Sequence, residues 1–241
     1  MCAYQIYPLH LGTITRPKAQ LVSTDRSGAI LDIPILAWYI TDGQKKILVD
    51  TGGIEPDGIH FAPYVRPADQ RLDAALSRLG VSGADIDIVI LTHLHWDHSG
   101  CLNIFPNAEF FVQREELHYA IDPIPAHKNN YDLQRIFSVN YTILDGDAQI
   151  TDGVSVVLSP GHSNGHQCVL VDTEEGPYLI LGDMVNLLEA WEAVPPVANG
   201  YHVSLLDYHR SFQKLKQIPA KVLPGHDPDV LRHPVYPIRE T

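Results

Sequence analysis

The chain alternates between short apolar runs and segments with helical spacing. The apolar runs are bounded by Gly, Asp, Asn or Pro and predict strands at 33–40, 46–49, 86–91, 109–112, 154–158, 168–171, 178–181 and 221–223. Asp42-Gly43 separates the first two runs, which is typical of a hairpin.

Two segments place their apolar residues on one face of a helix, at Leu72, Ala75, Leu76 and Leu79 in the first and at Leu205, Tyr208, Phe212 and Leu215 in the second. Gly80 stands where a helix C-cap glycine belongs, and Ser204 with Asp207 resembles a capping box. The stretch 119–141 carries two prolines and an Asn-Asn pair, and predicts an irregular connection or lid with some helix. Strands and helices mixed in this order indicate sheets covered by helices.

Composition and charge narrow the function classes. The 241 residues fit one large domain or two small ones, with 45% hydrophobic and 19% charged residues. The net charge of −12 argues against a nucleic-acid partner and indicates a solvated acidic surface. No run approaches the roughly 18 apolar residues of a membrane span. The three cysteines, at positions 2, 101 and 168, are odd in number and lack metal or redox spacing, so we predict free thiols. The start of the chain lacks a secretory signal. Together these features lead us to expect a cytoplasmic protein.

The densest polar motif, Thr-His-Leu-His-Trp-Asp-His-Ser-Gly, is Thr92–Gly100, directly after a predicted strand. Imidazole and carboxylate are the usual zinc ligands besides thiolate. Because residues i and i+2 of an extended segment point the same way, His93 and His95 can coordinate one ion together. The chain then turns, so that Asp97 and His98 can grip a second. The alternative, a metal-free polar loop, rarely concentrates three histidines and an aspartate in this way.

Three more residues of ligand type stand singly in the first turn after an apolar strand: His162 and His226, each in Pro-Gly-His, and Asp183 in Gly-Asp. The adjacent glycine lets the backbone turn sharply and approach an ion. Each signal alone is weak, because a histidine after a strand is more often structural. Together with the dense motif they give seven candidate metal ligands, namely His93, His95, Asp97, His98, His162, Asp183 and His226.

These motifs, in this order, resemble the metallo-β-lactamase superfamily over nearly the whole chain, up to His226. The resemblance implies an α/β (α+β) fold, a four-layer αββα sandwich in a single domain over residues 1–241, with a dinuclear site at one edge of its two sheets. It also implies how the ligands divide: His93, His95 and His162 on the first ion, Asp97, His98 and His226 on the second, and Asp183 as the bridge.

Several branches of that superfamily fit less well. The commonest dinuclear β-lactamases have a cysteine in place of Asp183, and flavodiiron proteins have a glutamate in place of His95 and an added flavin domain. Glyoxalase II-type thioesterases carry a C-terminal helical region, for which the fifteen residues after His226 are too few, and the tRNA-processing branch needs a basic surface. The chain is instead similar to the N-acyl homoserine lactonase-like branch, on the softer matches of Arg66–Asp73, Phe105–Ala108 and Gln113–Leu117.

One position departs from that branch. The quorum-quenching lactonases carry a tyrosine three residues after the bridging aspartate, pointing at the substrate carbonyl, and this chain has Asn186 there. Asparagine donates a hydrogen bond but is shorter and has no phenolic proton. The departure concerns the substrate and leaves the metal site intact.

The resemblance implies a metal-dependent hydrolase that opens a lactone or ester of a small molecule. Two divalent ions, Zn²⁺ by default with Mn²⁺, Co²⁺ or Fe²⁺ also suited to nitrogen and oxygen ligands, would activate a bridging hydroxide for attack on the carbonyl. Asp97 is the expected proton donor to the leaving group, and Asn186 a donor to the oxyanion. Two alternatives stay open, hydrolysis of a thioester, cyclic amide or phosphoester in the same site, and a non-catalytic metal-binding protein. The oligomeric state is open, a homodimer included, and no nucleic-acid or membrane partner is expected.

A few residues outside the ligand set also invite a functional interpretation. Asp50 matches an aspartate that supports the metal site in this superfamily, with a plain turn residue as the alternative. The eight other histidines are expected at the surface or in the core, and His166 is the one best placed to support a ligand. Phe61, Tyr64 and Trp191 could line an apolar pocket, although ordinary packing is the commoner role.

Overall fold

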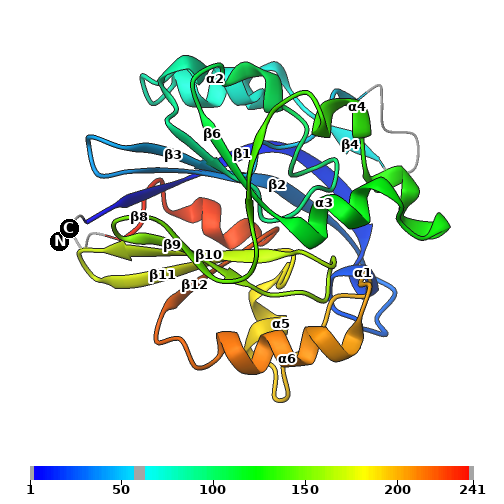
Figure 1. Cartoon of the computed structure of the whole chain (residues 1–241). Helices are drawn as coiled ribbons and strands as arrows, with labels where there is room; N and C mark the ends of the chain where they lie inside the picture. Colours follow the sequence, from blue (N-terminus) through cyan, green and yellow to red (C-terminus); the bar gives the residue numbers. More distant parts are fainter. Residues whose placement is uncertain (1–2, 57–62, 239–241) are drawn as a thin grey trace.

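Two sheets lie face to face, and helices cover the outer face of each (Figure 1). This arrangement comes from a computed structural model that describes residues 3–56 and 63–238. In Figure 1, α2 lies above the upper sheet and α4 at its upper right, and α5 and α6 lie below the lower sheet. The expected α/β fold with its αββα layers is therefore confirmed.

The larger sheet has the strand order β4-β1-β2-β3-β5-β6-β7. Its strands are β1 (Gln5–Pro17), β2 (Ile30–Thr41), β3 (Lys46–Val49), β4 (Tyr64–Val65), β5 (Ile88–Ile90), β6 (Glu109–Gln113) and β7 (Tyr141–Leu144). Strands β3, β5, β6 and β7 run parallel to one another. The segments that follow β3 and β5 therefore leave the sheet at the same edge, which brings Asp50 close to Thr92–Gly100.

The smaller sheet has the order β12-β11-β10-β9-β8. Its strands are β8 (Ala148–Thr151), β9 (Val154–Leu158), β10 (Gln167–Thr173), β11 (Gly176–Gly182) and β12 (Lys221–Pro224). Strand β11 is parallel to β12, and both β9 and β11 are antiparallel to β10. The ends of β9, β11 and β12 therefore meet at one edge, where His162, Asp183 and His226 follow them.

The space between the sheets is filled by side chains from both. Trp38 and Ile90 of the larger sheet and Val169 and Ile180 of the smaller one belong to a single buried cluster. The outer faces are covered by α1 (Lys18–Leu21), α2 (Leu72–Ser77), α3 (Arg114–Ile121), α4 (Leu133–Ile136), α5 (Leu188–Glu192) and α6 (Leu205–Leu215). Helix α6 buries Tyr208, Phe212 and Leu215 of the predicted apolar face, whereas Leu205 at the first position of the helix is exposed. The hydrophobic effect thus holds the two layers of strands and the outer helices together.

The structure confirms most of the predicted elements and adds strands that the pattern did not reveal. The eight predicted strands and both predicted helices are present, and Gly43 in the hairpin and Gly80 after α2 have φ of +90° and +72°. Ser204 accepts a hydrogen bond from Asp207 N at the start of α6, which is one half of a capping box. Strands β1, β4, β7 and β8 were not predicted. The stretch 119–141 contains the end of α3, a 3₁₀ helix (Pro125–Asn130) and α4 within irregular chain, as expected.

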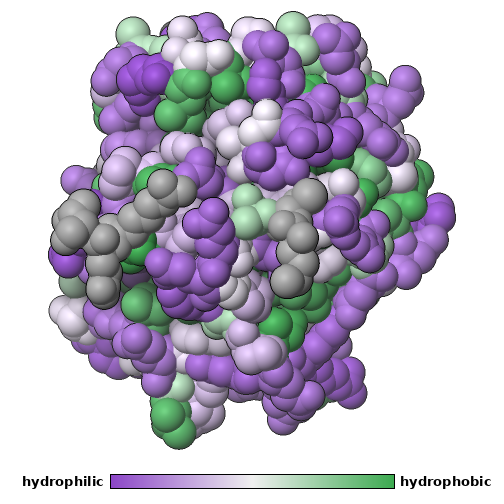
Figure 2. All heavy atoms as spheres, turned by 90° about the vertical axis from the view of Figure 1, so that its left-hand side faces the viewer, coloured by the Kyte–Doolittle hydropathy of each residue, from purple (hydrophilic) through white to green (hydrophobic). Residues whose placement is uncertain are grey.

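The predicted polar surface and free thiols can be compared with the structure. Figure 2 shows that the face on the left-hand side of Figure 1 is mainly hydrophilic, with apolar side chains in small groups. In the described ranges, no helix combines the length and the apolar character needed to cross a membrane. Cys101 and Cys168 are free thiols, as predicted, while Cys2 lies outside the described residues.

Candidate metal centre

The seven predicted ligands converge at the edge where the strands of both sheets end. They come from four loops, those that follow β5, β9, β11 and β12. All seven side chains are buried, and three overlapping groups of them bring possible ligand atoms within 4.8 Å of one another. Those groups are His93, His95 and His162; His93, His98 and Asp183; and Asp97, His98 and His226.

The first group has the spacing of a metal-binding triad. Nδ1 of His95 lies 2.9 Å from Nε2 of His93 and 3.0 Å from Nε2 of His162. Nitrogen ligands about 2.0–2.1 Å from a tetrahedral zinc ion lie roughly 3.3 Å apart, so only a small adjustment separates these three atoms from a coordination shell. The three imidazoles can therefore hold one ion.

Asp183 connects the first group to the second. Its Oδ2 lies 3.3 Å from Nε2 of His162, whereas its Oδ1 lies 3.1 Å from Nε2 of His98 and 3.0 Å from Nε2 of His226. Oδ2 of Asp97 lies 3.9 Å from the same nitrogens of His98 and His226. One carboxylate thus presents a different oxygen to each half of the site, which is the geometry of a bridging ligand.

Two buried polar atoms at this junction lack a hydrogen-bond partner, and a metal ion would be a partner for both. Nε2 of His98 and Oδ1 of Asp183 are buried and form no well-aligned hydrogen bond with any residue of 3–56 or 63–238. An unpaired buried polar group costs free energy, and a divalent cation between these atoms would remove that cost. The donor set of nitrogen and carboxylate oxygen therefore fits two divalent metal ions.

Backbone carbonyl oxygens determine which ring nitrogen of His162 and of His226 is free to bind a metal ion. Nδ1 of His162 lies 2.9 Å from the carbonyl oxygen of Tyr201, and Nδ1 of His226 lies 2.8 Å from that of Pro34. A carbonyl oxygen only accepts, so Nδ1 must carry the proton in both residues. Their Nε2 lone pairs are left to face the site.

Asp50 orients two further ligating imidazoles, those of His98 and His93. Its Oδ2 lies 2.8 Å from Nδ1 of His98 and also accepts a hydrogen bond from Oγ1 of Thr92. The Thr92 oxygen in turn lies 3.1 Å from Nδ1 of His93. Asp50 has φ of +61°, a conformation that aspartate tolerates better than most residues. It is thus more than a turn residue, because it orients His98 directly and His93 through Thr92.

Burial and charge set the protonation of these groups in the metal-free protein. Burial lowers the pKa of His93 and of His95 well below the usual value, so both imidazoles are neutral at pH 7. Burial alone would raise the pKa of Asp183, but the nearby His226 and His98 outweigh it and hold that pKa well below its usual range. Neutral imidazole and ionised carboxylate are the forms that bind metals.

Close backbone contacts allow the loops to converge. A Cβ added to Gly225, next to His226, would lie 2.5 Å from the carbonyl oxygen of Gly182, next to Asp183. One added to Gly161, next to His162, would lie 2.5 Å from Cα of Tyr208 in α6. The Tyr208 hydroxyl also donates to the backbone carbonyl oxygen of Asp183 at 3.0 Å. The predicted role of glycine beside the ligands is therefore confirmed as close approach between chain segments.

Glu116 of α3 ties two ligand loops together. One carboxylate oxygen accepts from N of Leu94 and the other from N of Gly165, each at 3.0 Å. The side chain is fully buried, and burial raises its pKa. This role could not be predicted from the sequence, because the interacting groups are backbone amides far from Glu116 in the chain.

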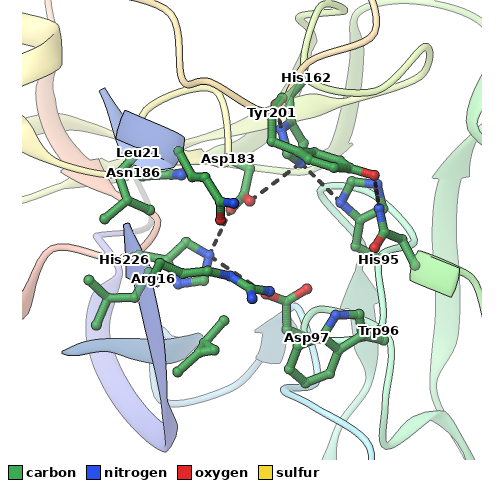
Figure 3. A pocket seen from close by; sticks show the side chains of 14 residues that line it. Arg16, Leu21, His95, Trp96, Asp97, His162, Asp183, Asn186, Tyr201 and His226 are labelled. Carbon is green, nitrogen blue, oxygen red and sulfur yellow. Dashed lines mark hydrogen bonds and ion pairs between the residues drawn. The ribbon is translucent and has the colours of Figure 1, made fainter. Parts of the chain in front are cut away.

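A cavity of about 210 Å³ opens onto the metal site. One side is formed by the ligand residues His95, Asp97, His162, Asp183 and His226. The remaining lining residues are Ile14, Arg16, Gln20, Leu21, Ile33, Trp96, Asn130, Asn186 and Tyr201. Figure 3 shows Arg16 and Leu21 on the side opposite His95 and Trp96. A small molecule in this cavity would contact the metal ligands directly.

Asn186 lies in the wall of the cavity, beside the metal ligands. It lines the cavity, is 5% exposed, and its Oδ1 has no hydrogen-bond partner among the described residues. Tyr201, which sequence patterns did not reveal, lines the same cavity and shares a hydrogen bond with Nδ2 of Asn130. Burial raises the pKa of Tyr201 to about 12, so its phenol keeps its proton at neutral pH.

The other residues singled out from the sequence serve packing. Trp191 packs at a tilted angle against Phe212 and lies under the ammonium group of Lys216, and Tyr64 packs edge-on against Trp96. Neither Trp191 nor Tyr64 is among the lining residues of the cavity. Phe61 lies outside the described residues. His166 is buried behind His93, with ring centroids 5.3 Å apart, and its Nδ1 lies 3.0 Å from Oγ of Ser159. It packs against a ligand, and its only hydrogen bonds within the described part of the chain are with Ser159 and not with a ligand.

The fold and the site define the class of protein. The model of the metallo-beta-lactamase superfamily matches residues 31–226, and the chain belongs to that superfamily. Its sandwich and its buried His and Asp groups are those of a metal-dependent hydrolase.

Within that class, the chain is similar to N-acyl homoserine lactonases and belongs to their branch. It is 30% identical to the N-acyl homoserine lactonase of Bacillus sp over 94% of both chains, and 31% identical to N-acyl homoserine lactonase AttM of Azorhizobium caulinodans over 95% of both. A solved N-acyl homoserine lactone hydrolase, with the product N-hexanoyl-L-homoserine at its catalytic metal centre, matches with a TM-score of 0.84 and 26% identity over 96% of both chains. The dizinc quorum-quenching lactonase AidC shares the fold, with a TM-score of 0.75 and 20% identity over 93% of this chain and 88% of that one.

Proposed function

We propose that the protein is a dinuclear metal-dependent hydrolase that opens lactones, or related esters, of small molecules. The observation that carries the proposal is the bridging geometry of Asp183, whose two oxygens face two separate groups of ligands. In this proposal His93, His95 and His162 hold one ion, Asp97, His98 and His226 hold the other, and Asp183 joins them. The lactonase relatives support a lactone as the substrate class.

The ions supply the chemistry that the side chains lack. When bound, two adjacent divalent cations lower the pKa of water and act as Lewis acids toward a carbonyl oxygen. We propose Zn²⁺ as the metal, because four of the ligands around each ion would be imidazole nitrogen or carboxylate oxygen, while Mn²⁺, Co²⁺ and Fe²⁺ suit the same set.

Two side chains of the protein are proposed to position the substrate and to donate a proton to the leaving group. The amide Nδ2 of Asn186 is placed to donate a hydrogen bond to the carbonyl oxygen of a substrate in the cavity. Asp97 lines the same cavity and is the group proposed to hold the proton that the leaving alkoxide needs. These assignments give Asp97 two roles, as a metal ligand and as a proton donor.

The proposal extends to the setting in which the protein works. We infer a single domain over residues 1–241, because the two sheets share one core of buried side chains. The free thiols support a reducing cytoplasmic location. A small lactone or ester is the proposed partner, and the acidic net charge of −12 disfavours nucleic acid. A homodimer is compatible with all of these features.

The experiment that tests the function combines metal analysis with a substrate panel. Elemental analysis of the purified protein should find two divalent ions per chain, and chelation should abolish turnover. The panel contains short N-acyl homoserine lactones, simple γ- and δ-lactones, an aryl ester, a thioester, a cyclic amide and a phosphoester. We expect the metal-loaded protein to open lactones fastest.

Two outcomes would contradict the proposal. Preferential hydrolysis of the thioester, cyclic amide or phosphoester would replace the substrate class. Two bound ions with no turnover of any member would favour a non-catalytic metal-binding protein. Asp183→Asn, which keeps the size of the side chain but not its charge, should lose metal and turnover together.

A further inference from the structure

Arg16 differs from every other arginine in the described part of the chain. The eight others there each have at least one hydrogen bond or ion pair, at Arg26, Arg66, Arg71, Arg78, Arg114, Arg135, Arg210 and Arg232. The guanidinium of Arg16 has neither with any residue of 3–56 or 63–238, although the side chain is half-buried. A partly desolvated cation without a partner costs free energy, and an arginine has five N–H donors to satisfy.

The backbone of β1 directs Arg16 into the cavity. Ile14 and Arg16 are two residues apart on this strand and therefore point to the same face of the sheet. Both line the cavity, together with Ile33, which pairs with Ile14 on the neighbouring strand β2. Figure 3 shows the Arg16 side chain extending into the cavity toward Asp97 and His226. No ion pair within 4.0 Å joins Arg16 to Asp97 or to any other described carboxylate.

The charges around the cavity decide whether an anion is a favourable occupant. Two divalent ions would bring four positive charges, and the carboxylates of Asp97, Asp183 and Asp50 with one metal-bound hydroxide would balance them. The cation of Arg16 is then left without a balancing negative charge. The protein as a whole is strongly acidic, with a net charge of −12, so a general attraction for anions cannot come from its surface. Any preference for an anionic substrate must therefore come from groups in the cavity.

We propose that Arg16 binds an oxyanion group on the substrate, and that the preferred substrate is a small lactone carrying a carboxylate or a phosphate at some distance from the reacting carbonyl. This inference rests on the proposed lactone hydrolysis and names the substrate class within it. A guanidinium donates two parallel hydrogen bonds to a carboxylate or to a phosphate, whereas a neutral acyl chain has no oxygens at its end to accept them. Gln20 and Asn130, which also line the cavity, supply further polar contacts.

Three lactones that share one ring test the proposal. N-succinyl, N-(3-phosphonopropanoyl) and N-pentanoyl homoserine lactone have side chains of similar length that end in a carboxylate, a phosphonate and a methyl group. We expect kcat/KM of the wild-type protein to be about 10- to 100-fold higher for one of the anionic lactones than for the neutral one, as an arginine–oxyanion pair implies. The two anionic lactones distinguish carboxylate from phosphate.

Three variants assign that preference to Arg16. Arg16→Gln should abolish it by lowering kcat/KM for the anionic lactone, with kcat/KM for N-pentanoyl homoserine lactone changed less than about 3-fold. Arg16→Lys should restore part of it, because the charge returns without the paired donors. Arg210→Gln, which removes an exposed arginine of α6, should keep the wild-type preference. Metal content is measured in every variant.

A binding measurement separates this inference from the proposed function. Titration calorimetry with the ring-opened succinyl and pentanoyl products should show tighter binding of the succinyl product to the wild-type protein, and the difference should vanish in Arg16→Gln. If no lactone is hydrolysed, the proposed function fails, while this difference would still support Arg16 as an oxyanion-binding residue. Equal kcat/KM for anionic and neutral lactones, or a preference that Arg16→Gln leaves unchanged, would overturn the inference.

Discussion

Oδ2 of Asp50 lies 2.8 Å from Nδ1 of His98, so a carboxylate outside the ligand set orients an imidazole of the second group of ligands. Asp50→Asn would keep the size of the side chain, but an amide nitrogen in place of Oδ2 donates and cannot accept from His98 or from Thr92. We expect metal affinity to fall about 10- to 100-fold, as for other residues that orient ligating histidines. Titration with a competing chelator measures this. Asp87→Asn, at the residue just before β5 and therefore at the opposite end of that strand from the ligands, is the control and should bind metal normally.

Asp97 is proposed to have two roles that one substitution can separate. Asp97→Asn keeps an oxygen that can face the second ion but removes the carboxylate that carries a proton. We expect the metal content to stay near two ions per chain while kcat for lactone opening falls by about 10²- to 10⁴-fold. Lactone turnover that survives with the metal retained would eliminate the proton-donor role.

The amide of Asn186 is expected to act on the reacting carbonyl. Asn186→Ala removes the donor, and we expect kcat to fall by about 10- to 1000-fold with little change in KM, because the hydrogen bond strengthens as charge develops on the oxygen. Steady-state kinetics on one lactone, together with metal analysis, measure the effect. A rise in KM alone would assign Asn186 to substrate binding instead.

Glu116 is expected to stabilise the loops that carry the ligands even without metal. Glu116→Gln replaces one of two acceptor oxygens, each of which faces a backbone amide, so we expect the free energy of unfolding in chelator to fall by about 1–3 kcal/mol. Urea denaturation measures the change. Glu115→Gln, at the neighbouring exposed position of α3, should lie within about 0.5 kcal/mol of the wild-type protein. Equal stability of the two variants would show that Glu116 does not clamp the loops.

His166 should make stability depend on pH. Burial lowers its pKa to about 3, whereas an unfolded histidine titrates near about 6.5. Between these values the unfolded chain binds the proton and the folded one does not, so the stability this residue contributes is fully present above about pH 6.5 and is lost as the pH falls toward 3.

Substitution of His166 isolates that contribution. In chelator, the free energy of unfolding of His166→Gln should fall less steeply between pH 6.5 and 4 than that of the wild-type protein, by up to about 1.4 kcal/mol per pH unit. The other histidines titrate in both proteins and cancel in the comparison. Parallel pH profiles would mean that His166 is protonated in the folded state.

The ligand set could be predicted from the sequence because each ligand follows a buried strand. Strand ends that point the same way meet at one edge, so Thr92–Gly100, His162, Asp183 and His226 converge as a direct result of the sheet topology. The strands and the two amphipathic helices predicted sheets covered by helices, and the resemblance to the superfamily implied the αββα layers. Local patterns were sufficient wherever the relevant signal was local.

The cavity could not be predicted in this way, because its other residues reach it through pairings far apart in the sequence. Arg16 depends on β1, which was not predicted, since Pro8 and Gly12 interrupt its alternation and a register shift separates His10 from Thr13. Tyr201 lies in irregular chain between α5 and α6, where no periodicity marks it. The aromatic residues chosen for the cavity, Tyr64 and Trp191, satisfy their burial by packing on neighbours.

The hydroxyl of Tyr208 anchors the main chain at Asp183 from a helix of the outer layer. A minimal version of this protein that kept both sheets and every ligand but lacked α6 would therefore retain the donors and lose the support that aims the shared carboxylate. Redesign for a smaller scaffold has to keep this helix, whereas its solvent-facing side, where Arg210 lies, remains open to change.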